Sequence, residues 1–191
     1  MSDIVDQLLT RRTQQLRRWH LHRTNGQETL AEHQAQTARI AVEIALLCIH
    51  HCVYGEGDEV PRPTECATAA LYHDEAETLV SDVSASFKYT HPEAREMIHQ
   101  WEREAVSELW NPYPTLVQTS LQDYTLEVDL TEQEQQIVKY SDALSALSFI
   151  REEQDRGNRQ FDHIHARQMR VMGTFDWPWL QVLRRKIKDL P

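Results

Sequence analysis

The sequence predicts an all-α protein folded as a single helical bundle. Apolar residues recur at three- and four-residue steps along almost the whole chain, which is the period of an amphipathic helix. No segment alternates apolar and polar residues convincingly enough to indicate a half-buried strand. The 191 residues suit one well-buried domain, and only five glycines leave no evident linker. We therefore expect one domain over residues 1–191.

The first two helices are predicted from an apolar stripe and a capping signal. Residues 3–20 carry the stripe of an amphipathic helix, and Asn25-Gly26 breaks the pattern. The segment 29–32, Thr-Leu-Ala-Glu, has the form of a capping box and predicts a long helix to about Cys52. His33 then lies in the first turn of that helix.

The next part of the chain is predicted to place a His-Asp pair at a helix end. Two glycines and two prolines indicate a loop over 55–63, after which Thr64 begins a short helix. This helix carries His73-Asp74 at its carboxyl end. A helical turn over 75–80 and a loop over 81–86 are expected to follow.

The second half of the chain is also predicted to be helical. Pro92 suits the first turn of a helix over 92–109, which the two prolines within 111–114 end. Thr131 and Glu134 form a second capping box, which predicts a helix to about 155 with Asp142 near its middle. Two further helices complete the expected bundle, at 161–172 and 177–189.

Composition narrows the class of function. Because 30 acidic residues outnumber 20 basic ones, most of the surface should repel a nucleic-acid polymer, whereas a small phosphorylated substrate can still bind locally. No apolar run approaches 18 residues, so no membrane span is expected, and the N-terminus has no signal-peptide core. Three cysteines cannot all pair within the chain, which favours a reducing cytoplasm.

Two imidazoles and two carboxylates are the side chains most suggestive of chemistry. His33, His73-Asp74 and Asp142 are the ligand types of a divalent-metal hydrolase and suit Zn, Mn or Co. Taken separately, His33 is better explained as a structural histidine near a capped helix start. His73-Asp74 by itself is explained equally well as an ordinary pair at a helix end. The set indicates a metal site only if the helices bring its members together.

The sequence around these residues resembles a known family. Arg17-Arg18-Trp19 precedes the first histidine, which lies in Ala31-Glu32-His33, and the His-Asp pair lies within 70–82, followed by Phe87-Lys88-Tyr89. The last aspartate lies in the segment 138–144, Val-Lys-Tyr-Ser-Asp-Ala-Leu. Over about residues 12–155, this ordered set resembles the HD-domain phosphohydrolases. Within that group, it resembles bacterial 5'-deoxynucleotidases of the YfbR type and their phage relatives, which include deoxyadenosine-triphosphate triphosphohydrolases.

The resemblance implies a metal centre and a proton-transfer pair. It implies one divalent ion (Co, Mn, Zn or Mg) bound by four residues, which are His33, His73, Asp74 and Asp142. Glu77 and Asp82 would then act on the attacking water and on the departing O5', in an order that the sequence leaves open. Without the resemblance, both acidic residues fit a solvated face of the chain.

The resemblance also implies the residues that contact the substrate. Arg18 and Lys88 would bind the phosphate, with Arg18 counted among the catalytic groups. Trp19, which periodicity alone predicts as a core residue, would pack against the sugar and exclude a 2'-hydroxyl. Asp82 would also contact the nucleotide. Ala85 stands where relatives carry a threonine that contacts substrate, so it offers no hydroxyl there.

Three functions are compatible with these residues. The favoured one is a metal-dependent 5'-deoxynucleotidase that converts a deoxynucleoside monophosphate into deoxynucleoside and phosphate. The second is a deoxynucleoside-triphosphate triphosphohydrolase, for which Lys139 is a candidate extra cation because it lies three residues before Asp142. The third is a non-catalytic HD domain that senses a nucleotide. The expected partners are a small deoxynucleotide and further copies of the chain, in a dimer or larger homo-oligomer.

Overall fold

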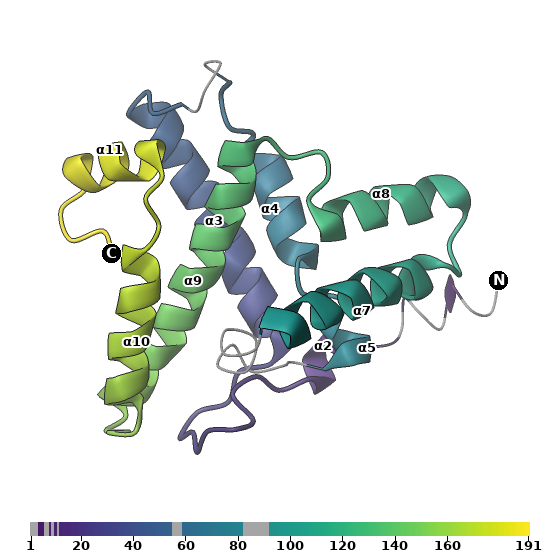
Figure 1. Cartoon of the computed structure of the whole chain (residues 1–191), viewed down its shortest axis with the longest axis horizontal. Coiled ribbons are helices and arrows are strands. Elements are labelled where there is room, and N and C mark those ends of the chain that lie inside the picture. Colours follow the sequence, from purple (N-terminus) through teal and green to yellow (C-terminus); the bar gives the residue numbers. More distant parts are fainter. Residues whose placement is uncertain (1–3, 6–7, 9, 11, 55–58, 82–91) are drawn as a thin grey trace.

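The structure is a computed structural model that describes residues 4–5, 8, 10, 12–54, 59–81 and 92–191. Within this part of the chain it contains helices and no strand, apart from one isolated bridge between Arg17 and Thr29, which confirms the all-α prediction. Figure 1 shows the long helices packed side by side. The helices are α2 (Arg12–Gln15), α3 (Leu30–His50), α4 (Pro63–Tyr72), α5 (Glu77–Val80), α7 (Pro92–Trp110), α8 (Thr115–Leu126), α9 (Glu132–Asp155), α10 (Phe161–Gly173) and α11 (Pro178–Lys186).

The two longest helices begin at the capping boxes that the sequence predicts. The Thr29 hydroxyl accepts from the Glu32 backbone N–H, and the Glu32 carboxylate accepts from the Thr29 N–H at 2.8 Å. Thr131 and Glu134 make the same reciprocal pair at the start of α9. Each box satisfies amide groups that a helix start leaves without intrahelical partners, so it fixes where the helix begins.

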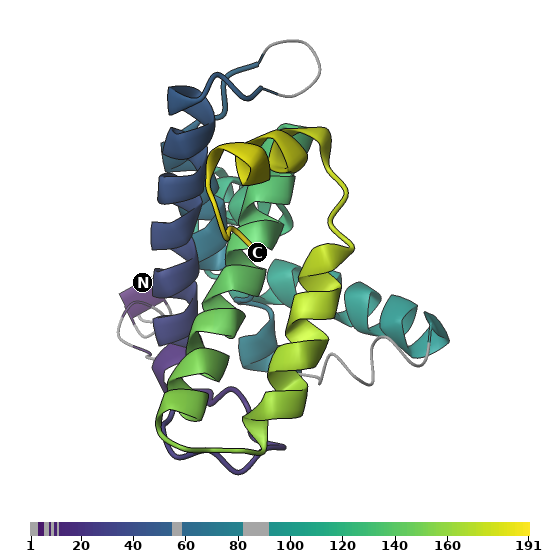
Figure 2. The same ribbon diagram turned by 90° about the vertical axis from the view of Figure 1, so that its left-hand side faces the viewer.

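The main core lies between α3, α4, α9 and the C-terminal helices. α3 packs against both α4 and α9, and α9 packs against α10, as the turned view in Figure 2 also shows for α3, α9 and α10. The core side chains come from four of these helices and include Ile44, Ala45, Ala69, Ala70, Ile137, Tyr140, Leu180 and Leu183. This packing brings the start of α3, the end of α4 and the middle of α9 together.

The prediction of a helix over 3–20 is wrong at its carboxyl end. α2 ends at Gln15, and the chain then runs antiparallel to the segment before α3. Leu30 donates its backbone N–H to Leu16 at 2.9 Å, and Arg18 donates to Glu28 at 3.0 Å. These long-range hydrogen bonds replace the helical ones, so Arg18 lies in a segment paired with the chain before α3. Trp19 begins the turn that follows, with a left-handed backbone at φ 62°, and neither residue lies on a helix.

The structure also contains a helix that the sequence analysis missed. α8 follows the prolines after α7 and packs against α7 and α4, and Figure 1 shows the α7–α8 pair reaching away from the long helices. No side chain caps its first turn, because its N-cap residue is Pro114. Its threonines and valine have low helix propensity, so tertiary packing stabilises it rather than a local signal. None of the described helices combines the length and the apolar character needed to cross a membrane.

Candidate metal centre

His73 and Asp74 lie where α4 ends, as predicted. His73 follows the last helical residue, Tyr72, and its Nδ1 lies 2.7 Å from the Ala70 carbonyl oxygen. A carbonyl oxygen can only accept a hydrogen bond, so Nδ1 carries the proton and donates it. In the neutral ring the Nε2 lone pair is therefore free to bind a cation.

His33 is oriented by a residue on a different helix. Its side chain is fully buried in the first turn of α3, and its Nδ1 lies 3.1 Å from the Ser145 hydroxyl on α9. That hydroxyl also faces the His33 carbonyl oxygen, at 3.4 Å. Ser145 can thus accept the Nδ1 proton while donating its own, which leaves the Nε2 of His33 available as a ligand.

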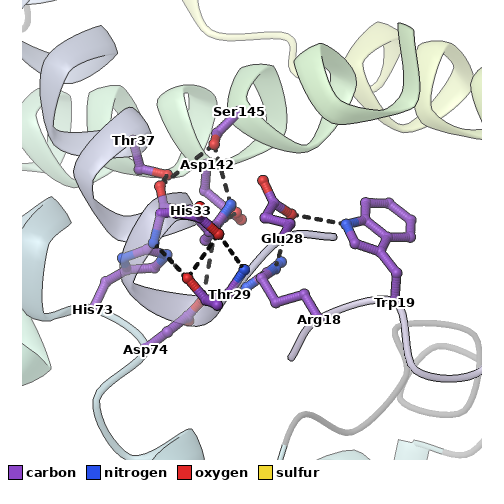
Figure 3. A network of polar contacts seen from close by, with 11 residues as sticks. Arg18, Trp19, Glu28, Thr29, His33, Thr37, His73, Asp74, Asp142 and Ser145 are labelled. Carbon is purple, nitrogen blue, oxygen red and sulfur yellow. Dashed lines mark hydrogen bonds and ion pairs between the residues drawn. The ribbon is translucent and has the colours of Figure 1, made fainter. Parts of the chain in front are cut away.

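Asp74 brings the two imidazoles together. Its Oδ2 lies 3.1 Å from His73 Nε2 and 3.8 Å from His33 Nε2, and candidate ligand atoms of these three residues all lie within 4.8 Å of one another. Figure 3 shows the group from close by. Both Nε2 atoms are buried, and neither makes a well-formed hydrogen bond within the described residues. Two imidazole nitrogens and a carboxylate oxygen that converge in this way are donor types that bind a divalent cation, so this set fits one.

Asp142 lies at the edge of this group. Its Oδ1 is 3.0 Å from His33 Nε2, and it lies near the middle of α9, as predicted. Its side chain is 41% exposed, against 22% for Asp74, and it is not part of the compact three-residue group. The helices therefore bring all four predicted ligands together, with Asp142 on the solvent side.

The charges in this cluster depend on one another. Burial lowers the pKa of His73, but the carboxylates of Asp74 and Asp142 outweigh burial and raise that pKa to about 10. Burial raises the pKa of Asp74, but His73, Arg18 and His33 outweigh it and hold the pKa well below its usual range. At neutral pH, His73 is therefore an imidazolium beside a carboxylate when no cation is bound.

We predict from this charge state that metal binding releases a proton. A cation needs the bare Nε2 of His73, so it must displace the proton held there, and its affinity should rise with pH up to about 10. Calorimetric titration of the metal-free protein in two buffers with different ionisation enthalpies measures the protons released. A binding enthalpy that is equal in both buffers, with an affinity independent of pH, would contradict this prediction.

Glu77 occupies the first position of α5, directly after the cluster. Its backbone N–H donates to the Asp74 carbonyl at 3.0 Å, and the residue is buried, with 8% of its surface exposed. A mostly buried carboxylate on the turn that follows the cluster suits proton transfer. Three further predicted residues lie outside the described part of the chain, which are Asp82, Ala85 and Lys88.

Arg18 and Trp19 reach the same site from the segment before α3. Arg18 Nη1 donates to Asp74 Oδ2 at 2.9 Å, and its Nε lies 3.7 Å from the Glu28 carboxylate. Trp19 donates its indole N–H to Glu28 at 2.8 Å. Its ring stacks on Phe149, with centroids 5.4 Å apart, and joins a small core cluster with Ile150. Trp19 is thus partly a core residue, as periodicity predicts, and is linked to Arg18 through Glu28.

Three residues of this region were not predicted from the sequence. Ser145 was detectable, because it lies three residues after Asp142 and therefore on the same side of a helix. Glu28 has no sequence signal, because its role depends on Trp19 and Arg18 folding back over it. Glu127 was missed together with α8, the helix that it ends.

A cavity of about 440 Å³ opens beside the cluster. The residues of its wall that bear on the site are His73, Asp142, Glu127, Glu132, Lys139 and Trp177. Burial raises the pKa of Glu127, whose backbone has the left-handed conformation at φ 56°. Lys139, which was predicted to share a helical face with Asp142, lines this same cavity.

Comparison with known proteins relates this chain to 5'-deoxynucleotidases. Residues 8–188 match the family described as YfbR-like 5'-deoxynucleotidases. A 5'-deoxynucleotidase of Vibrio vulnificus is 31% identical over 76% of this chain and 73% of its own length. A 5'-deoxynucleotidase of Pasteurella multocida is 29% identical over 84% of this chain and 80% of its own length.

Solved structures share the fold. An HD-domain phosphohydrolase from Listeria innocua has a TM-score of 0.72 and 21% identity, and the match covers 88% of this chain and 77% of that one. A protein from Pyrococcus horikoshii has a TM-score of 0.70 at 17% identity and covers 95% of this chain and 96% of its own. At these identities the likeness concerns the helical fold.

Proposed function

Because the chain belongs to the YfbR-like 5'-deoxynucleotidase family, we propose that it hydrolyses deoxynucleoside monophosphates to deoxynucleosides and phosphate. The reaction would depend on one divalent cation held by four residues, which are His33, His73, Asp74 and Asp142. The observation that carries this proposal is the pair of buried Nε2 atoms that converge on Asp74 Oδ2.

The metal would supply two effects when bound, a lower pKa for the attacking water and neutralisation of charge on the phosphoryl oxygens. The four residues would hold the cation and leave room on it for both water and a phosphate oxygen. We propose that the cation is Co, Mn, Zn or Mg, because a set of two imidazoles and two carboxylates suits several divalent ions.

The remaining catalytic roles belong to Arg18 and Glu77. Arg18 lies against Asp74, so its guanidinium is positioned to donate hydrogen bonds to a phosphate at the same centre. Glu77 would exchange a proton with the attacking water or the departing O5', since an alkoxide is a poor leaving group. Asp82 and Lys88 keep their proposed roles at the sugar and the phosphate, on the family resemblance alone.

A substrate panel tests the reaction class. The protein is incubated with each deoxynucleoside mono- and triphosphate and with Mn, Co, Zn or Mg in turn, and the phosphate product is identified. We expect inorganic phosphate from monophosphates. Tripolyphosphate from triphosphates would favour a triphosphohydrolase, and nucleotide binding without turnover under every metal would favour a non-catalytic sensor.

We also propose that the chain forms one domain and associates with copies of itself. α11 packs in the same core as α3 and α9, which supports a single domain. Large apolar side chains are exposed on α7 and α8, among them Met97, Trp101 and Leu116. Such surfaces are common at interfaces between subunits. Light scattering during size-exclusion chromatography measures the mass in solution.

We predict that Trp19 selects deoxyribose over ribose. A rigid ring beside C2' would exclude a hydroxyl, and fit alone typically discriminates by about 10–200-fold. The Trp19→Ala variant should therefore narrow the deoxy-to-ribo ratio of kcat/KM by about that factor, measured on dAMP and AMP.

A matched variant separates the ring from its hydrogen bond. Trp19→Phe retains an aromatic ring but loses the indole N–H that binds Glu28. We expect it to preserve most of the sugar preference. If both variants keep the wild-type ratio while their melting temperatures fall, Trp19 is a core residue with no role in sugar selection.

A further inference from the structure

The cavity and Trp19 lie at opposite ends of the metal centre. Trp19 stacks on Phe149 in the second half of α9, whereas Lys139 and Glu132 line the cavity along its first half. An α-helix rises about 1.5 Å per residue, so Lys139 and Phe149 are separated by about 15 Å along its axis. Asp142 lies between them, and Figure 3 shows Trp19 and His73 on opposite sides of the cluster.

This arrangement indicates how a bound nucleotide would be oriented in the site. If the sugar contacts Trp19 and the reacting phosphate lies at the cluster, the side of that phosphate away from the sugar faces the cavity. A monophosphate would extend no further group into the cavity. A triphosphate would place two more anionic phosphates among the cavity side chains.

The described cavity wall carries more negative than positive charge. Glu127, Glu132 and Asp142 are carboxylates, and Lys139 is the one basic side chain besides the imidazole of His73. The Lys139 ammonium lies 5.9 Å from the centroid of the Phe175 ring and makes no ion pair within the described residues. Asp142 contacts His33 at 3.0 Å and is a proposed metal ligand. Glu132 is exposed and accepts a hydrogen bond from Gln136. Glu127 is therefore the carboxylate best placed to act on a longer phosphate chain.

We propose that Glu127 is a specificity-determining residue that restricts the enzyme to substrates with a single phosphate. This inference rests on the proposed deoxynucleotidase function. Like charges repel more strongly in a partly enclosed site than in bulk water, because solvent and salt screen them less. Glu127 is only partly exposed, and Gln135 donates to its backbone carbonyl oxygen at 3.1 Å, which anchors the end of α8 at the cavity wall.

The test compares two substrates on each enzyme. Glu127→Gln removes the charge and keeps the shape, so it should raise the dATP-to-dAMP ratio of kcat/KM about tenfold, equivalent to about 1.4 kcal/mol. The inhibition constant of dATP against dAMP hydrolysis should fall by a similar factor. Because the ratio compares two substrates on the same enzyme, any loss of folded protein cancels.

Two further variants test the sign of the charge effect. Glu132→Gln makes the same chemical change at an exposed position, where screening is stronger, and should alter the ratio less. Lys139→Gln removes the cation and should move the ratio in the opposite direction, against dATP.

The outcomes separate this inference from the proposed function. Absence of monophosphate hydrolysis by the metal-loaded wild type would refute the function itself. A wild type that hydrolyses dAMP, together with an unchanged ratio and inhibition constant in Glu127→Gln, would refute only the role of Glu127. A large rise in KM for dAMP in Glu127→Gln would also refute that role, because it would place the nucleoside in the cavity.

Discussion

Replacement of Asp74 by asparagine is expected to remove tight binding of a divalent cation and, with it, hydrolysis. Asp74 Oδ2 lies beside both histidine Nε2 atoms and accepts from Arg18, so a single atom organises the cluster. Asparagine keeps the shape but loses the charge that a cation requires. The loss in metal affinity should exceed the about 10–100-fold typical of removing an outer partner of a ligand.

Metal content after dialysis and turnover of dAMP are measured on the same samples. Ser145→Ala is the matched control, because it removes only the partner of His33 Nδ1 and should cost about 10–100-fold in affinity. Asp142→Ala tests the fourth ligand and should abolish metal retention and turnover together. Retained metal and full activity in Asp142→Ala would leave the compact group of three as the whole site.

Replacement of Glu77 by alanine is expected to reduce kcat by about 10²–10⁴-fold while leaving metal and nucleotide binding largely intact. The reason is that Glu77 would transfer a proton in the reaction without holding the ion. Pre-steady-state turnover, equilibrium binding of dAMP and metal content together distinguish these effects. A parallel fall in metal affinity would make Glu77 a ligand.

Glu75→Gln provides the control for that experiment. Glu75 lies on the same turn, and burial raises its pKa to about 7, which also suits an acid at neutral pH. The expected loss of kcat in Glu75→Gln is much smaller than in Glu77→Ala. If the order is reversed, the proton-transfer role belongs to Glu75, which the sequence analysis did not select.

The helix starts at Thr29 and Thr131 were predictable because their signals are local. Each capping box joins residues only three positions apart, so the sequence contains the whole interaction. The apolar period likewise predicted the long helices and the all-α class. The order of the four candidate ligands, with their flanking residues, was enough to indicate the family.

The end of the first helix was not predictable in this way. Arg17, Arg18 and Trp19 continue a helical pattern, but the backbone there bonds to residues 28–30 instead. A period of three to four residues reports only nearby neighbours and does not detect a competing partner ten residues away. The same limit hid α8, which has weak propensity and depends on packing against α4 and α7.

The sequence by itself determined the helical class and the kinds of side chain available for a metal site. The tertiary structure decided how these side chains meet, because Asp74 and Asp142 both approach His33 only when α3, α4 and α9 pack together. It also decided which nitrogen each histidine presents, through Ser145 and the Ala70 carbonyl. Distances between residues far apart in the chain follow from the burial of whole helix faces, and no local pattern encodes them.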